Sequence, residues 1–374
     1  MAKEVKLFEG AIATSRAIID IGSKPVGFQW YKNISIQPLI ESALPSVIDE
    51  VSHTLPYEGL ASIVPQIYSS GSFLQDTANR MFDQDGVTIY SINAMPIQMG
   101  RKAYILLNEI DTEHGKKEFI SYISRSPIDS EKGDEAARDF SNLRILHERA
   151  HERLTDEAKK KYSFIGPYAL GDAATYNGHS YRGFSMPFVD GYGELRADIM
   201  NGKNGANTAY FRYAIPYTKE MEDQNRRSEN VARRFVNSPI LDMKTISSSH
   251  QDILLRQLMA TEEAQIISKQ KDDILVGNAL LYLLADGHFP KEFQINAGDW
   301  MADLSADRLK LFLITVRGGF EIIQSDEEWI KRMLAQTEPL PGGEMKGLAF
   351  PPFYAIEDRI RRALTKAKKL LKTR

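Results

Sequence analysis

The sequence contains no cysteine among its 374 residues. This absence excludes disulfide bonds, zinc sites built on cysteine and a thiol nucleophile. No run of about 18 apolar residues is present, so the sequence predicts no membrane-spanning helix. The first residues, MAKEVKLFEG, carry charge where a secretory signal needs an apolar core. Together these features predict a cytoplasmic protein.

The overall composition is that of a globular protein. Hydrophobic residues make up 43% of the chain and charged residues 26%, and neither value indicates disorder. The chain is longer than a single hydrophobic core usually supports, so two lobes are expected. Strand and helix patterns both occur along the chain, and we therefore expect a mixed α/β fold.

Apolar periodicity predicts the main elements. Residues 16–31 predict two strands joined by a turn at Gly22-Ser23. Further strands are expected at 87–92, ending before Met95-Pro96, and at 104–110, 118–123, 162–165, 181–189 and 309–316, with 195–200 as the hairpin partner of 181–189. Helices are expected at 37–51, 72–82, 134–154, 219–236, 250–285, 320–334 and from 357 onward, and the small residues of 166–174 predict one more helix start.

Three of the predicted strands end in turns rich in glycine, at 18–23, 188–193 and 314–320. Glycine lets backbone N–H groups approach anionic oxygens because no Cβ stands in the way. An aspartate at a strand end can hold a hydrated Mg²⁺ ion. Each motif alone is weak, since a turn after a strand is usually a plain hairpin. Their order along the chain is what points to a phosphate site.

That order resembles the superfamily of actins, heat-shock chaperone ATPases and sugar kinases. Residues 20–30, DIGSKPVGFQW, are similar to the first phosphate turn, especially that of plasmid-segregation actins. Residues 190–198 resemble the second phosphate turn and 316–323 the adenosine turn, and 162–174 stand where the family has a connecting segment. The resemblance implies an actin-like α/β fold, with two ribonuclease-H-like lobes around a nucleotide cleft. The lobes would be residues 1–180 and 181–340, followed by a loop and a basic amphipathic helix in 341–374.

The resemblance also implies a chemistry for these turns. Family members bind ATP with Mg²⁺ and couple nucleotide binding or hydrolysis to filament assembly, as in DNA segregation or cytoskeletal positioning; GTP is the other nucleotide to test. Asp20 and Asp190 would hold the ion through water, and Asp172 is the acid nearest to the position that orients the attacking water. The residues implied to contact the nucleotide are Gly22, Ser23, Lys24, Gly191, Gly193, Gly318 and Gly319.

A second motif, His147-Glu148-Arg149-Ala150-His151, fits the H-E-x-x-H pattern of zinc proteases. His147 and His151 would bind zinc from one helix face, with Glu148 as general base. However, no G-x-x-H segment follows to supply a third histidine. The charged residues around the motif also fit the solvated face of a core helix, stabilised by i,i+4 ion pairs.

The C-terminal segment is strongly basic. Residues Arg359 to Arg374 contain eight lysines and arginines and no acid; because the whole chain has a formal net charge of −3, the rest of it carries −11. This amphipathic helix has two interpretations that the sequence leaves open. It binds nucleic acid, anionic lipid or an acidic partner surface, including the acidic body of a neighbouring copy. Alternatively, its apolar stripe packs on the body while its lysines are only solvated. A catalytically degenerate actin-fold scaffold that acts through this tail is the alternative to an ATPase.

Overall fold

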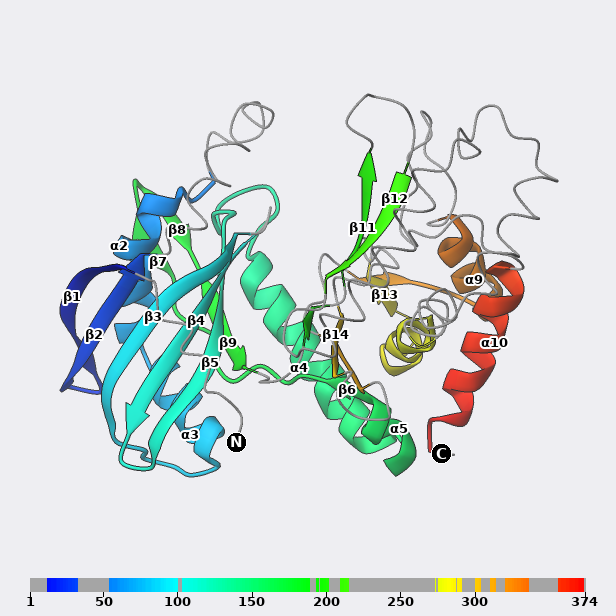
Figure 1. Ribbon diagram of the computed structural model, residues 1–374, viewed down its shortest axis with the longest axis horizontal. Coiled ribbons are helices and arrows are strands. Elements are labelled where there is room, and N and C mark those ends of the chain that lie inside the picture. The colour runs from blue at the N-terminus through cyan, green and yellow to red at the C-terminus, as the bar shows by residue number, and fades with distance from the viewer. Residues whose placement is uncertain are drawn as a thin grey trace. The chain divides into compact units, whose positions relative to one another are not determined.

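The computed structural model describes residues 12–32, 54–99, 103–188, 193–194, 196–201, 209–214, 273, 275–286, 288–290, 300–303, 310–313, 320–335 and 356–372 (Figure 1). The chain divides into two compact units. Unit 1 comprises residues 1–144 and 166–188, and unit 2 comprises residues 145–165 and 189–374. Segment 145–165 thus belongs to unit 2, whereas the sequence-based boundaries assign it to lobe I. The C-terminal helix also belongs to unit 2, whereas the sequence-based boundaries place it in a separate segment after lobe II.

Unit 1 is built on a six-stranded sheet in the order β1-β2-β3-β4-β5-β9. The strands are β1 (Ile12–Ile21), β2 (Lys24–Lys32), β3 (Ile89–Met99), β4 (Ala103–Thr112), β5 (Gly115–Ser124) and β9 (Gly183–Pro187). Every neighbouring pair is antiparallel except β2 and β3, which are parallel. A parallel pair needs a crossover connection, and the helices between these strands supply it. A small hairpin of β7 (Ala174–Tyr176) and β8 (His179–Tyr181) completes the unit.

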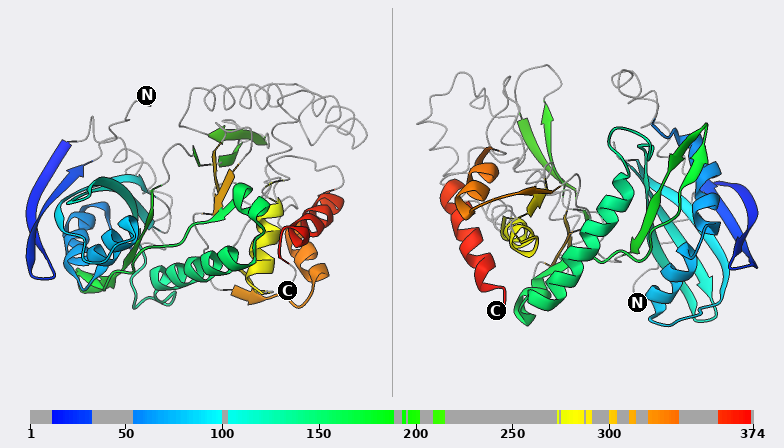
Figure 2. Two further views of the ribbon diagram at one scale, coloured as in Figure 1. Left: turned by 90° about the horizontal axis from the view of Figure 1, so that it is seen from below. Right: turned by 180° about the vertical axis from the view of Figure 1, so that it is seen from behind.

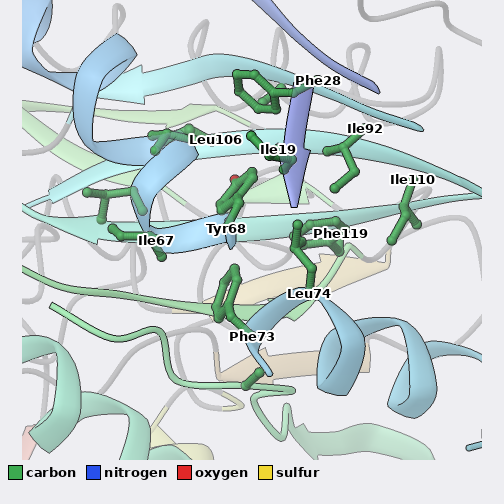
Figure 3. Close-up of a cluster of buried hydrophobic side chains, with 14 of the residues drawn as sticks. Ile19, Phe28, Ile67, Tyr68, Phe73, Leu74, Ile92, Leu106, Ile110 and Phe119 are labelled. Atoms are coloured by element: carbon green, nitrogen blue, oxygen red, sulfur yellow. The ribbon is translucent and has the colours of Figure 1, made fainter. Parts of the chain in front are cut away.

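The two crossover helices lie inside the curve of this sheet (Figure 2). They are α2 (Tyr57–Ser69) and α3 (Phe73–Phe82). Apolar side chains of both helices pack with inward-facing residues of the strands to form the core of unit 1, as the close-up of labelled residues such as Phe73, Leu106 and Phe119 shows (Figure 3). Burial of this apolar surface is the main favourable term in folding of the unit.

A polar cluster lies within this core. The hydroxyl of Tyr68 on α2 donates to the amide oxygen of Asn108 on β4 at 2.6 Å, and it lies 2.8 Å from Oγ of Ser121 on β5. The Asn108 amide donates to Ser121 Oγ at 3.0 Å and to the carbonyl of Phe119 at 3.3 Å. Asn108 and Ser121 are fully buried. Because hydrogen bonds are directional, this cluster fixes where α2 lies along β4 and β5.

Unit 2 combines short sheets with helices. One sheet has the order β10-β14-β15-β6, from β10 (Gly193–Glu194), β14 (Trp300–Asp303), β15 (Lys310–Leu313) and β6 (Tyr162–Phe164). Two further sheets have two antiparallel strands each. One pairs β11 (Arg196–Asn201) with β12 (Ala209–Ala214), and the other pairs β13 (His288–Pro290) with β16 (Phe320–Ile322). The helices are α5 (Asp156–Lys161), α9 (Asp326–Ala335), α10 (Ile356–Lys369) and a further helical stretch at 275–284. The long helix α4 (Glu135–Arg153) crosses from unit 1 into unit 2.

Several sequence predictions are confirmed. The mixed α/β class is correct, and the hairpin at 16–31 is formed by β1 and β2. The strands expected at 104–110 and 118–123, and the helices expected at 72–82, 134–154 and from 357, are also present. The helices expected at 37–51 and 219–236 lie outside the described residues, as does most of 250–285. The finer expectation of actin-like lobes stays a prediction.

Three predictions of local structure are wrong. Strand β3 does not end before Met95-Pro96 but continues to Met99, because a bulge between Pro96 and Gln98 accommodates the proline. Residues 166–173 do not begin a helix; they run in extended form beside β9, and the amide of Tyr168 donates to the carbonyl of Ser185 at 2.8 Å. Residues 320–322 form strand β16 rather than the start of a helix, which begins at Asp326.

One pairing is also wrong, and one helix was missed. The strand at 196–201 pairs with β12 and not with the strand at 183–187. No sequence pattern predicted α2, because Pro65 stands inside it and proline is a strong helix-breaking signal. Tertiary packing overrides that signal, since one face of α2 is buried against the sheet. Within the described part of the chain, no helix has the length and apolar character needed to cross a membrane.

The buried polar cluster of unit 1 predicts a specific loss of stability. Asn108→Ala should lower the free energy of unfolding by about 2–3 kcal/mol, because it leaves buried groups without hydrogen-bond partners. Asn93→Ala is the matched control: Asn93 is only half-buried and donates to Glu109 at 3.0 Å, so its removal should cost about 1 kcal/mol or less. Urea unfolding followed by circular dichroism measures both values. Equal losses for the two variants would show that the cluster does not hold α2 in place.

Candidate functional site

The turn between β1 and β2 is the described part of the predicted phosphate site. Gly22 has a φ of +54° and Ser23 a φ of +69°. Both central residues are thus left-handed, as in the two-residue turns that match the twist of a hairpin. A Cβ added at Gly22 would meet no other atom within 4 Å. The side chains of Asp20, Ser23 and Lys24 are exposed, so the turn presents an open backbone flanked by one acid and one cation.

An acid in the turn between β4 and β5 interacts electrostatically with Lys24 of this turn. Glu113, between β4 and β5, accepts a hydrogen bond from the Thr88 amide at 3.0 Å. That hydrogen bond, aided by the charges of His114 and Lys24, lowers the pKa of Glu113. Glu113 is therefore ionised at neutral pH.

The other predicted phosphate and adenosine residues are not brought to this turn by any described contact. Asp190, Gly191, Gly318 and Gly319 lie outside the described residues. Gly193 begins β10 in unit 2, where it is paired with Ala302. The convergence of the three glycine turns therefore stays a prediction.

Asp172 has a structural role at the turn between α2 and α3. Its Oδ2 atom would lie 2.8 Å from a Cβ placed on Gly71, whose φ is +49°. The backbone amide of Asp172 donates to Ser70 Oγ at 3.3 Å. No described contact joins Asp172 to the β1–β2 turn, so the structure gives it no link to the other predicted catalytic residues.

The H-E-x-x-H motif lies on α4, in unit 2. Nδ1 of His147 is 2.7 Å from the carbonyl oxygen of Phe164, and since a carbonyl only accepts, the Nδ1 atom carries the proton. His151 is exposed. Among the described residues, no group of three or more acidic or histidine side chains is placed to hold a metal ion. The motif therefore lacks a third ligand in that part of the chain.

Arg149, in the middle of the motif, contacts the end of the helical stretch 275–284. It donates to the carbonyl of Leu284 at 2.9 Å and lies 3.3 Å from Asp286. Arg153 forms a second ion pair with Asp286 at 2.6 Å. Positive charge at a helix C-terminus is favourable because the last carbonyls carry partial negative charge. These contacts fit the interpretation of α4 as a structural helix with a charged surface.

The basic helix α10 packs on unit 2 through its apolar stripe. Ile360, Ala363, Leu364 and Ala367 are buried. Beyond the helix, the amide of Lys372 donates to the carbonyl of Arg153 at 2.7 Å. The stripe is thus packed as the second interpretation expects, whereas binding of a partner by the exposed face stays a prediction.

Acidic residues of unit 2 neutralise part of the positive charge of α10. Arg361 bonds Glu327 at 2.5 Å and Glu357 at 2.8 Å, and the hydrogen bond from Arg361 lowers the pKa of Glu327. Lys368 pairs with Asp326, and Lys366 lies 4.0 Å from the buried carboxylate of Asp273. The exposed cations outside these pairs include Arg362, Lys369 and Lys372. The surface available to a nucleic acid is accordingly less basic than the sequence alone indicates.

Comparison with known proteins gave no match. No protein-family model, no curated protein and no solved structure is significantly similar to this chain. The function must therefore be inferred from the residues and their geometry.

The contact of His147 predicts a stabilising role without metal. His147→Ala should lower the free energy of unfolding by about 1 kcal/mol through loss of its hydrogen bond, whereas His151→Ala should change it by about 0.5 kcal/mol or less. Thermal unfolding with and without added Zn²⁺ checks this. If zinc raised the unfolding temperature of the wild type but of neither variant, the zinc-site hypothesis would be correct instead.

The packing of α10 predicts which of its residues matter for stability. Leu364→Ala should cost about 2–4 kcal/mol because it leaves a cavity under the helix. Lys369→Ala, on the exposed face, should stay within about 0.5 kcal/mol of the wild type. Urea unfolding gives the values, and hydrogen exchange of the amides in 356–369 locates the effect. A helix held only by its charges would respond in the reverse order.

Proposed function

We propose that this chain binds ATP or GTP together with Mg²⁺ at the β1–β2 turn, and couples that binding to self-association in a fold of the actin type. The observation that supports the proposal is the open turn itself. Gly22 and Ser23 leave their backbone uncovered, and Asp20 and Lys24 flank them with exposed side chains.

Each residue of the turn has a role in the proposed site. The backbone at Gly22 admits a phosphate oxygen to within hydrogen-bonding distance of its N–H group. The ammonium of Lys24 offsets the phosphate charge through charge-assisted hydrogen bonds. Asp20 contacts the water shell of Mg²⁺, which keeps most of its waters when bound. In the proposal Asp190, Gly191 and Gly193 complete the phosphate site, and Gly318 and Gly319 contact the adenosine.

A second candidate is a scaffold of the same fold that does not hydrolyse nucleotide. The observation that favours it is the form of the connecting segment. Residues 167–171 are held beside β9 by backbone hydrogen bonds, and Pro167 and Tyr168 occupy the positions where the family supplies a Glu or Gln to orient water. Asp172 lies at the α2–α3 turn, where its backbone amide donates to Ser70 Oγ. Under this alternative the chain assembles, and acts on a partner, without turnover of ATP.

The proposal predicts a defined effect of the turn residues on nucleotide binding. Lys24→Ala and Asp20→Ala should each weaken binding of Mg²⁺-ATP by about tenfold, because each removes a charged contact to the phosphates or the ion. Asp85→Ala, an exposed acid of the same unit outside the turn, should bind as the wild type does. Isothermal titration calorimetry with ATP and with GTP, each with Mg²⁺, measures the affinities.

Two further measurements separate the candidates. ATP-dependent pelleting of the wild type, lost in Lys24→Ala, would support coupling of the nucleotide to assembly. Assembly without nucleotide binding, or binding without release of phosphate, would favour the scaffold. A wild type that binds neither nucleotide would overturn the proposed site.

A further inference from the structure

Strand β1 is the terminal strand of the six-stranded sheet. It pairs with β2 on one side, and no described strand pairs with its other side, so it forms the margin of the sheet (Figure 1). Its residues 15–18 are exposed, and Ile18 is 75% exposed. An isoleucine this exposed on an edge strand is unusual, because proteins ordinarily protect such edges from other chains.

The hydrogen-bonding groups of three residues on β1 point to the open edge. Ile21 and Lys24 flank the two-residue turn, and such flanking residues form a hydrogen-bonded pair. Bonded and non-bonded pairs then alternate along an antiparallel ladder. Arg16, Ile18 and Asp20 therefore fall in non-bonded pairs with β2, and their N–H and C=O groups are directed outward.

The side chains of the same three residues share the outer face of the sheet. Ile19 and Ile21 are buried on the inner face, and side chains alternate along a strand. Ile18 is opposite Gly27 on β2, so no neighbouring side chain covers it there. Arg16, Ile18 and Asp20 thus place a cation, an exposed apolar side chain and an acid at every second position along the outer face of β1.

We propose that β1 is the contact surface for a second copy of this chain, paired antiparallel and centred on Ile18. In that register Ile18 lies opposite Ile18 of the second copy, and Arg16 lies opposite Asp20 in both directions. The outward N–H and C=O groups of the three residues exchange hydrogen bonds with the same groups of the second copy. One continuous sheet then runs through both copies.

The charge pattern selects a second copy as the occupant. Charged side chains on an edge strand ordinarily oppose pairing with other chains, unless the pairing partner brings opposite charges to them. Here Arg16 and Asp20 are symmetric about Ile18, so antiparallel pairing places opposite charges across the contact twice. The contact is isologous and closes as a dimer, and a filament would need a further surface. The inference rests on the edge geometry, not on the proposed nucleotide binding.

Charge reversal tests the proposed dimer. Because a second charge reversal should restore dimerisation, loss of the dimer in a single variant can be distinguished from failure to fold. Sedimentation equilibrium without nucleotide, from about 1 µM to about 500 µM, covers the range of weak interfaces. The wild type should dimerise, and Arg16→Asp or Asp20→Arg alone should weaken the dimer about tenfold or more, because like charges meet twice. The double variant R16D/D20R should dimerise again. An equimolar mixture of the two single variants should form a heterodimer, since one copy then carries two acids and the other two cations.

Charge reversals away from β1 serve as controls for a general effect of charge on dimerisation. Asp85→Arg and Lys132→Asp reverse exposed charges elsewhere in unit 1 and should leave the dimer unchanged. Arg16→Asp lies outside the proposed nucleotide site and should keep ATP binding, so failure of this inference is distinct from failure of the proposed function. A wild type that stays monomeric throughout, or single variants that do not complement each other, would overturn the inference. A change in stability with no change in mass would show that another segment of the same chain covers the edge.

Discussion

The hydrogen-bonded cluster of Tyr68, Asn108 and Ser121 is the constraint on which the arrangement of unit 1 depends. Hydrophobic burial draws α2 and α3 onto the sheet, but that force is non-directional. A buried amide with bonds to a helix and to two strands has only a few acceptable geometries. Thr77 of α3 and Ser185 of β9 make a similar buried contact at 2.6 Å. Both helices are thereby held in register with particular strands.

The first hairpin lies at the margin of the sheet of unit 1. The helices α2 and α3 form the crossover between the parallel strands β2 and β3, and β1 is the outermost strand. The turn at Gly22-Ser23 and the exposed edge around Ile18 both belong to this hairpin. Asp20 belongs to both features. A magnesium ion at the turn and a second copy at the edge would therefore bind the same carboxylate, and each would affect the other.

In unit 2, charge and packing act together on the C-terminal helix. Its apolar stripe is buried, and acids such as Asp326 and Glu327 on α9 pair with its cations. Exposed ion pairs contribute little individually to stability. Their main effect is on the surface potential, because the paired cations no longer present a uniformly basic face. Acidic residues of unit 2 thus neutralise part of the positive charge of the C-terminal helix.

The sequence by itself determined the elements whose signals are local. The alternation in 16–31 and the 3.6-residue spacing in 134–154 reflect side-chain directions within one strand or one helix, and the structure contains both elements. The residues of the first turn also lie close together in the chain, so Asp20, Gly22 and Lys24 could be singled out from the sequence, but phosphate binding by them stays a prediction. Tertiary structure alone decided that α2 forms across Pro65, that β3 continues past Pro96, and that 196–201 pairs with β12. It also decided that Ile18 is exposed. These outcomes depend on which distant segments supply packing and hydrogen-bond partners, and no local spacing of residues records that choice.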